Sequence, residues 1–138
     1  MSRLRGSAIG RARLLLDTHV LVWWMHDPSR LSKRVVAAIR EPDNEILVSA
    51  AVAWELAIKV KIEKITPASL IDELSLGLQQ QSFTELEISV AQAVAAGLLP
   101  LHHRDPFDRL LVAQSLSLGV SILSADRVLD LYQVNRVW

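Results

Sequence analysis

The sequence predicts an α/β domain, a parallel sheet flanked by helices. Short runs rich in Leu, Ile and Val alternate with longer helical runs, the order typical of parallel strands joined by crossover helices. At 138 residues the chain suits one domain, which would bury roughly two thirds of its unfolded surface. Apolar residues make up 51% of the sequence, so a substantial core is expected. We predict a single domain over residues 13–138.

The first thirteen residues differ in charge from the rest of the chain. MSRLRGSAIGRAR carries four arginines and no acid, and its apolar content is too short and broken for a signal peptide or a membrane span. We expect residues 1–12 to be a flexible basic arm or residues ahead of the natural start.

In the first half of the chain, strands are predicted at 13–17 (RLLLD) and 45–49 (EILVS), and helices at 18–26, 35–41 and 51–64. Ser32 is the expected N-cap of the second helix, which stops at Pro42. Thr66 and Pro67 are expected to end the third.

The second half repeats this alternation. Its predicted elements are a helix opened by Ser69, a short strand at 83–87, a helix capped by Ser89, a helix from Asp105 and Pro106 to Gly119, a strand at 120–124, a short helix from about Arg127 and an extended end at 133–138. No repeat, linker or low-complexity segment interrupts the pattern.

Charge and cysteine content exclude several classes of protein. Lys and Arg balance Asp and Glu at fifteen each, so no net field attracts nucleic acid or anionic lipid, and attraction to phosphate must be local. The sequence contains no cysteine, which excludes disulfides and thiolate metal sites. The expected compartment is a reducing cytoplasm.

Three acids stand at the boundaries of predicted elements. Asp17 ends the first strand, Asp126 follows the strand at 120–124, and Asp108 lies in the first turn of the helix before it. Ligands of parallel α/β proteins gather beyond the carboxyl ends of the strands, so these acids are candidates for one site. The alternative is local: Asp17 and Asp126 as N-caps, and Asp108 as a partner of the helix dipole.

A fourth acid, Glu55, interrupts an apolar stripe. Ala51, Ile58 and Ile62 share its face on a 3.6-residue period, so its carboxylate is expected to be buried. Burying an unpaired carboxylate costs several kcal/mol and therefore requires a partner. Lys59, four residues on, is the ordinary candidate but would suit an exposed pair, so we favour a divalent cation.

Clustered carboxylates repel one another, and one or more would stay protonated at neutral pH without a cation. Oxygen ligands without cysteine favour Mg²⁺ or Mn²⁺ over zinc, and a magnesium site keeps water positions open for substrate phosphate. The expected chemistry is metal-dependent cleavage of phosphodiesters.

Four motifs resemble one family in order and spacing. LLLDTHVLVWW, SAAVAWELAIKVKIEK, HHRDPFDRLLVAQS and ILSADRVLDLY are similar to the PIN domain of VapC-type toxins of bacterial toxin–antitoxin systems, over residues 13–138. The agreement of four separate motifs makes the resemblance specific. It implies a parallel sheet with flanking helices, a type II toxin that cleaves RNA with Mg²⁺ or Mn²⁺, a VapB-type antitoxin as inhibitor, a homodimer and no membrane association.

Carried over by position, the resemblance implies the catalytic and metal-binding residues Asp17, Glu55, Asp108 and Asp126. Thr18 matches the hydroxyl residue after the first acid, and Ser124 stands where relatives often have Thr. Both are expected to support the site. The segment ahead of Arg13 lies outside the pattern.

Other polar residues could either belong to the site or have an ordinary structural role. His102 and His103 are candidate ligands or acid–base groups, but adjacent side chains in a loop diverge, so we expect them to be solvated. His19 follows Asp17 closely enough to approach the site, although helix packing explains it equally. The following residues could contact phosphate but are expected to be solvated surface charges: Arg104, Arg109, Lys59, Lys61 and Lys64.

Trp23 and Trp24 are adjacent on a predicted helix and point about 100° apart, so both can hardly enter one core. We expect one to pack inside and the other to meet a protein partner.

Two other functions remain open at this level. An aspartyl-phosphate phosphatase would use Asp17 as nucleophile, but usually has a second acid two residues on, where this chain has His19. A non-catalytic RNA-binding or interaction module would need bases and aromatics more than convergent acids. A phospho-receiver domain would need a lysine at the end of the late strand, where the chain has Ser124, Ala125 and Asp126.

Overall fold

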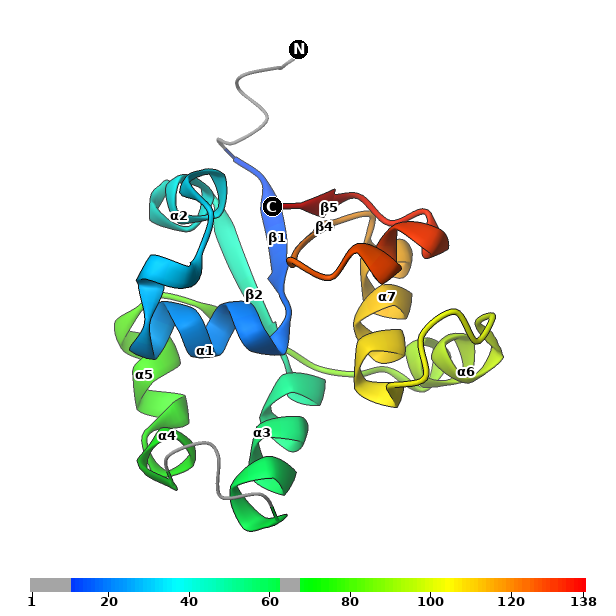
Figure 1. Cartoon of the computed structure of the whole chain (residues 1–138), viewed down its shortest axis with the longest axis horizontal. Helices are drawn as coiled ribbons and strands as arrows, with labels where there is room; N and C mark the ends of the chain where they lie inside the picture. The colour runs from blue at the N-terminus through cyan, green and yellow to red at the C-terminus, as the bar shows by residue number, and fades with distance from the viewer. Residues whose placement is uncertain (1–10, 63–67) are drawn as a thin grey trace.

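Five parallel strands form the centre of the molecule (Figure 1). This computed structural model describes residues 11–62 and 68–138. The strands are β1 (Arg13–Leu16), β2 (Glu45–Ser49), β3 (Thr84–Leu86), β4 (Ser121–Leu123) and β5 (Arg136–Val137). Their spatial order is β3-β2-β1-β4-β5, so β1 lies in the middle. The predicted α/β architecture with a parallel sheet is confirmed.

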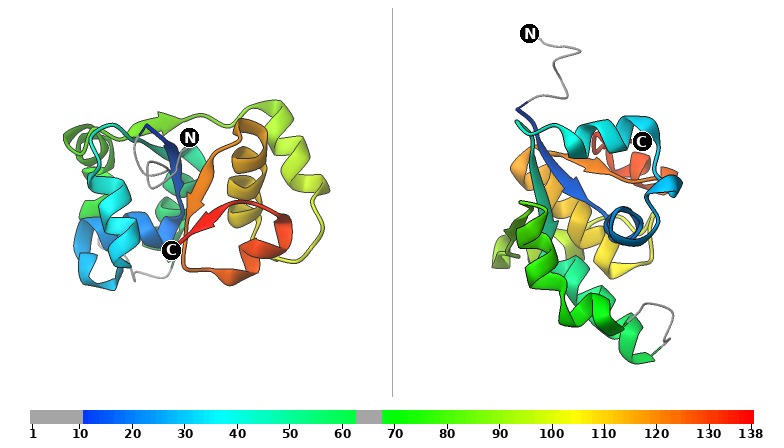
Figure 2. Two further views of the ribbon diagram at one scale, coloured as in Figure 1. Left: turned by 90° about the horizontal axis from the view of Figure 1, so that it is seen from above. Right: turned by 90° about the vertical axis from the view of Figure 1, so that its left-hand side faces the viewer.

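Helices cover both faces of this sheet. They are α1 (Thr18–His26), α2 (Lys33–Arg40), α3 (Ala50–Ile62), α4 (Ala68–Asp72), α5 (Leu74–Gln80), α6 (Val90–Leu98) and α7 (Pro106–Leu118), with 3-10 helices η2 (Pro28–Arg30) and η3 (Arg127–Tyr132). The view from above shows α1 and α2 on one face and α6 and α7 on the other (Figure 2). None of the helices in the described ranges is long and apolar enough to cross a membrane.

The core forms around β1 because apolar runs meet there from both sides. Leu15 pairs with Leu47 of β2 and with Ile122 of β4, and all three side chains are buried. A strand with neighbours on both edges and helices on both faces has no exposed side, which explains its uninterrupted leucines. The central strand therefore fixes the point at which Asp17 leaves the sheet.

Predicted caps set several helix boundaries. Ser32 accepts a hydrogen bond from the Val35 N–H, and Ser89 forms a capping box with Gln92. Asp105 accepts from the Phe107 N–H, and Gly119 ends α7 in the left-handed conformation at φ 66°. These local signals are confirmed.

Other boundaries differ from the predictions. Ser69 does not cap a helix: it lies inside α4, because the helix already begins at Ala68. The extended end is strand only at Arg136–Val137, because Gln133 adopts φ 63° and closes η3. The predicted basic arm at residues 1–10 and the expected helix end at 63–67 lie outside the described residues.

Candidate active site

The candidate site lies where the direction of the sheet connections changes. From β1 the chain continues to β2 and β3 on one side, whereas β4 and β5 occupy the other. Ligands of open α/β sheets bind beyond the strand ends at such a switch point. Asp17 follows β1 and Asp126 follows β4, and the Asp17 N–H donates to the Leu123 carbonyl at 3.2 Å. The two acids therefore leave neighbouring strands at the same edge.

Asp17 and Asp126 are both N-caps, as the local alternative predicted. Oδ1 of Asp17 accepts from the Val20 N–H at 2.8 Å, and Oδ1 of Asp126 accepts from the Val128 N–H at 3.0 Å. Each cap uses one carboxylate oxygen. The cap and a role in a shared site are therefore compatible, because the cap also fixes where the second oxygen points.

Ser124 joins these two acids. It is fully buried, its Oγ accepts from the Asp126 N–H at 3.0 Å, and its hydroxyl hydrogen-bonds Asp17. The supporting position expected for Ser124 fits this geometry, since the serine links the loop after β4 to the carboxylate after β1.

Glu55 is buried, as its place in the apolar stripe predicted. Thr18 Oγ1 donates to Glu55 Oε1 at 2.5 Å, and Lys59 Nζ lies 2.9 Å from Oε2. The stripe does not continue as expected, because Ile62 is 70% exposed. The expectation that Lys59 would remain a solvated charge is wrong: with its side chain 31% exposed, it reaches back to a carboxylate that the helix buries.

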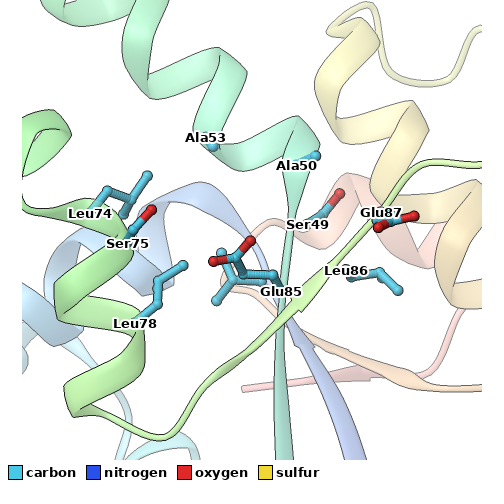
Figure 3. Close-up of a pocket in the computed structure, with 10 residues that line it drawn as sticks. Ser49, Ala50, Ala53, Leu74, Ser75, Leu78, Glu85, Leu86 and Glu87 are labelled. Atoms are coloured by element: carbon cyan, nitrogen blue, oxygen red, sulfur yellow. The ribbon is translucent and has the colours of Figure 1, made fainter.

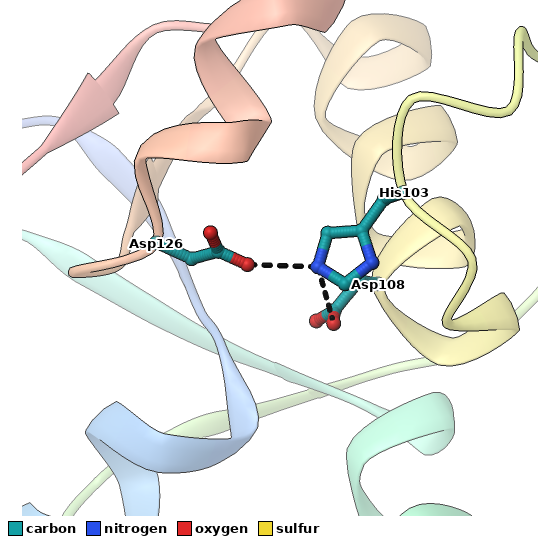
Figure 4. A group of neighbouring side chains, drawn as sticks. All are labelled: His103, Asp108 and Asp126. Atoms are coloured by element: carbon teal, nitrogen blue, oxygen red, sulfur yellow. Dashed lines mark hydrogen bonds and ion pairs between the residues drawn. The ribbon is translucent and has the colours of Figure 1, made fainter.

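Asp108 meets Asp126 through His103 (Figure 4). Nε2 of His103 lies 2.8 Å from Oδ2 of Asp126 and 3.2 Å from Oδ2 of Asp108. Nδ1 of the same ring accepts from the Asp105 N–H at 3.2 Å, so this network assigns the proton to Nε2. In this arrangement His103 donates toward two carboxylates from two different elements.

The expectation that His103 is solvated is therefore wrong. Its backbone N–H donates to the Tyr132 hydroxyl at 2.7 Å, and Arg109 donates to the carbonyls of His103 and Arg104 at 3.0 and 2.9 Å. These contacts hold the loop so that His103 turns inward. His102 is exposed, as expected, and its ring packs against Tyr132.

Arg109 also departs from expectation, because it braces this loop through backbone carbonyls instead of extending into solvent. One feature of the sequence could have predicted that both His103 and Arg109 lie close to the site. His103 and Arg109 flank the predicted helix start at Asp105, and side chains near a helix start lie close to one another. The loop conformation that selects His103 over His102 depends on Tyr132, 29 residues away.

Burial raises the pKa of two acids of the site, Asp17 and Asp108. Desolvation raises the pKa of Asp17, although hydrogen bonds from Ser124 and Val20 oppose that rise. Desolvation and the neighbouring charge of Asp105 raise the pKa of Asp108 to about 7, with smaller contributions from Glu55 and Asp17, while His103 lowers it. The carboxylates therefore repel one another, and the neighbouring positive charge and hydrogen-bond donors do not fully offset this repulsion.

Three of the four predicted acids open onto one pocket of about 400 Å³. Its lining residues are Asp17, His19, Trp23, His103, Asp105, Asp108, Ala125 and Asp126. Glu55 is not part of this lining. Thr18 and Lys59 contact its two oxygens, and its charge raises the pKa of Asp108. The structure thus brings three acids of the quartet to one pocket, and the fourth, Glu55, lies outside its lining.

The donor set fits a divalent cation. Carboxylate oxygens of Asp108 and Asp126 lie within 4.8 Å of each other and of the His103 ring nitrogen that donates to them, and Asp17 lines the same pocket. Carboxylate oxygens suit Mg²⁺ and Mn²⁺. A cation there would also offset the mutual repulsion that raises the pKa of Asp108.

A second recess, of about 160 Å³, lies between α3, α5 and β3 (Figure 3). Leu74 and Leu78 of α5 face Ala53 of α3 across it, and Glu85 reaches in from β3. None of the four predicted acids lines it. Its mostly apolar walls offer no comparable chemistry.

Comparisons with known proteins agree with this geometry. The model of the PIN domain family matches residues 14–135. Ribonuclease VapC22 of Mycobacterium tuberculosis is 37% identical over 118 residues, which cover 83% of this chain and 87% of that protein.

Solved structures share the fold. VapBC2 from Rickettsia felis, bound to a DNA fragment from their promoter, aligns with a TM-score of 0.64 and 14% identity over 91% of this chain and 98% of that one. FitAcB from Neisseria gonorrhoeae aligns with a TM-score of 0.62 and 17% identity over 91% of this chain and 96% of that one. At these identities the likeness concerns the fold alone.

Proposed function

Since the chain belongs to the PIN-domain family and is a homologue of VapC ribonucleases, we propose that it hydrolyses RNA phosphodiester bonds with Mg²⁺ or Mn²⁺, as the toxin of a type II toxin–antitoxin pair. The observation that carries this proposal is the convergence of Asp17, Asp108 and Asp126 on one pocket beyond the ends of β1 and β4. Caps or surface acids alone would not need to share a pocket.

Asp17, Asp108 and Asp126 line the pocket and would hold the ion there, and Glu55, the fourth predicted ligand, lies outside the lining. A bound ion would lower the pKa of an attacking water and neutralise charge on the phosphate. The protein supplies the positions: the Val20 and Val128 N–H groups fix one oxygen each of Asp17 and Asp126. Thr18 and Lys59 each contact one oxygen of Glu55 and hold its side chain in its buried position.

His103 has a separate task in this proposal. Its Nε2–H separates the Asp126 and Asp108 carboxylates when no cation compensates them. A cation bound between these acids would compete with that N–H. The ring would then either lose its hydrogen bonds to the two carboxylates or offer the cation an unprotonated Nε2. His103 thereby holds the acids ready in the metal-free protein.

The proposed partners are a VapB-type antitoxin with an amphipathic segment and a second copy of the chain. The expectation that one of Trp23 and Trp24 packs inside while the other stays outside is wrong: both are half-buried and pack against the edge of the core. Trp24 lies against Phe83 and donates to Gln81 at 3.0 Å. Its partial exposure supports a place at the antitoxin contact.

Cleavage of total cellular RNA, with cut sites mapped by sequencing of the new ends, tests the proposal. We expect defined cuts with Mg²⁺ or Mn²⁺ and none in excess EDTA, with activity restored when the metal is returned. Asp126→Asn should abolish these cuts. Asp43→Asn, which changes an exposed acid ahead of the opposite end of β2, should keep them. Undiminished cleavage in EDTA would refute the role of the metal.

A further inference from the structure

Trp23 is an aromatic residue in the wall of an acidic pocket. Its indole lines the pocket together with Asp17, Asp108 and Asp126. His19, one turn earlier on α1, also lines it, and the two rings lie 5.6 Å apart. An aromatic side chain is not needed to hold a cation, so its presence beside the acids requires a separate explanation.

A cluster of rings and one cation holds this indole in place. The Trp138 ring lies 6.0 Å from it, and the Arg30 guanidinium lies over it at 4.9 Å from the ring centroid. Arg30 is the basic residue of η2, directly after α1. A rigid indole bordered by a positive charge is a typical surface for single-stranded nucleic acid, which stacks its bases on aromatics and cations.

The adjacent tryptophan has different surroundings. Trp24 packs on Phe83, hydrogen-bonds Gln81 and does not line the acidic pocket. Trp54 is another exposed aromatic, 58% accessible and in edge contact with Phe107, but it too lies outside the lining. Only Trp23, of these three, shares a cavity with the acids.

We propose that Trp23 is the stacking surface for a nucleobase next to the scissile phosphate, with His19 and Arg30 beside it. This inference rests on the proposed function, and it names the feature of the RNA that the pocket recognises. The acids and their cation would take the phosphate, whereas the indole would take the flat face of the neighbouring base. Because every base has such a face, the contact orients the strand without selecting a sequence.

The test compares RNA with and without bases. Binding of fluorescein-labelled hexamers of rU, rA and rC, and of an abasic ribose-phosphate hexamer, is measured by anisotropy with Mg²⁺ present. The protein carries Asp108→Asn so that the oligonucleotides stay intact. We expect the base-containing hexamers to bind about tenfold more tightly than the abasic one, the size typical of one stacked base.

Trp23→Leu keeps an apolar side chain but removes the π-face. In the Asp108→Asn background it should bring the base-containing hexamers down to the affinity of the abasic one, which should itself stay unchanged. Trp23→Phe should keep most of the preference for bases. Trp24→Leu is the matched control on the same helix and should keep all of it. Melting curves of all variants separate loss of stacking from loss of folding.

Equal affinity of the Asp108→Asn protein for base-containing and abasic hexamers would overturn the inference, and so would no binding of any hexamer. A Trp23→Leu loss that is the same with and without bases would also overturn it, because it would indicate a structural role in the pocket. These outcomes leave the metal-dependent cleavage assay on the wild-type protein intact, so the two proposals can fail separately.

Discussion

The Thr18 hydroxyl donates a hydrogen bond to Glu55 across 2.5 Å and links two helices that begin at neighbouring strand ends. Both residues are buried, so this contact helps to make the glutamate tolerable inside the protein. It also links Thr18, the residue after Asp17, to the fourth predicted acid of the site.

Thr18→Val should therefore destabilise the protein by about 1–3 kcal/mol, because it keeps the shape but leaves a buried oxygen of Glu55 without this donor. Chemical denaturation measures the effect. Thr84→Val is the matched control, since Thr84 donates to Glu45 at an exposed site and its loss should cost under about 0.5 kcal/mol. Equal losses in the two variants would contradict a special role for the buried contact.

Substitutions of the two acids in HHRDPFDRLLVAQ should have different effects on activity and stability. Asp108→Asn should abolish RNA cleavage while the metal-free melting temperature stays unchanged or rises, because a repelled carboxylate is removed. Asp105→Ala should cost about 1 kcal/mol of stability, the usual value of a lost cap, and lower activity only slightly. A melting curve and an RNA-cleavage rate for each variant test these two expectations. The reverse pattern would mean that the ligand has been assigned to the wrong acid.

The stability of the metal-free protein should fall as pH rises. The pKa of Asp108 is about 7 in the folded protein and 3.8 ordinarily, so the folded state binds this proton more tightly than the unfolded state. Such a group favours folding most at low pH, and that contribution is lost as pH rises from about 4 through about 7. Melting temperatures across this range, in EDTA, should show the fall, and Asp108→Asn should reduce it. A wild-type profile that matches the variant's would contradict this assignment.

His103→Ala should increase the extent to which added cation raises the stability of the protein. Loss of the Nε2–H leaves Asp126 and Asp108 without a shared donor, at a cost of about 1–3 kcal/mol. The rise in melting temperature on adding Mg²⁺ should then exceed that of the wild type. His102→Ala, which alters an exposed ring packed on Tyr132, is the control and should respond like the wild type. Equal responses of all three proteins would exclude His103 from the cluster.

The sequence by itself determined the elements and their order. Capping at Ser32, Ser89 and Asp105 depends on hydrogen bonds within a few residues, and burial of β1 depends on an uninterrupted leucine run. Such signals are local, so they can be read along the chain. The same holds for the positions of Asp17 and Asp126 after their strands, which a parallel sheet brings to one edge.

The tertiary structure alone decided which side chains complete the site. His103 rather than His102 reaches the acids because Tyr132 and Arg109 hold its backbone, and Tyr132 lies 29 residues away. Trp23 rather than Trp24 lines the pocket, and Trp24 instead packs on Phe83 and donates to Gln81. Neither choice is encoded in local propensity or period. Each follows from contacts between elements distant in sequence, which form only when the sheet and its helices have packed.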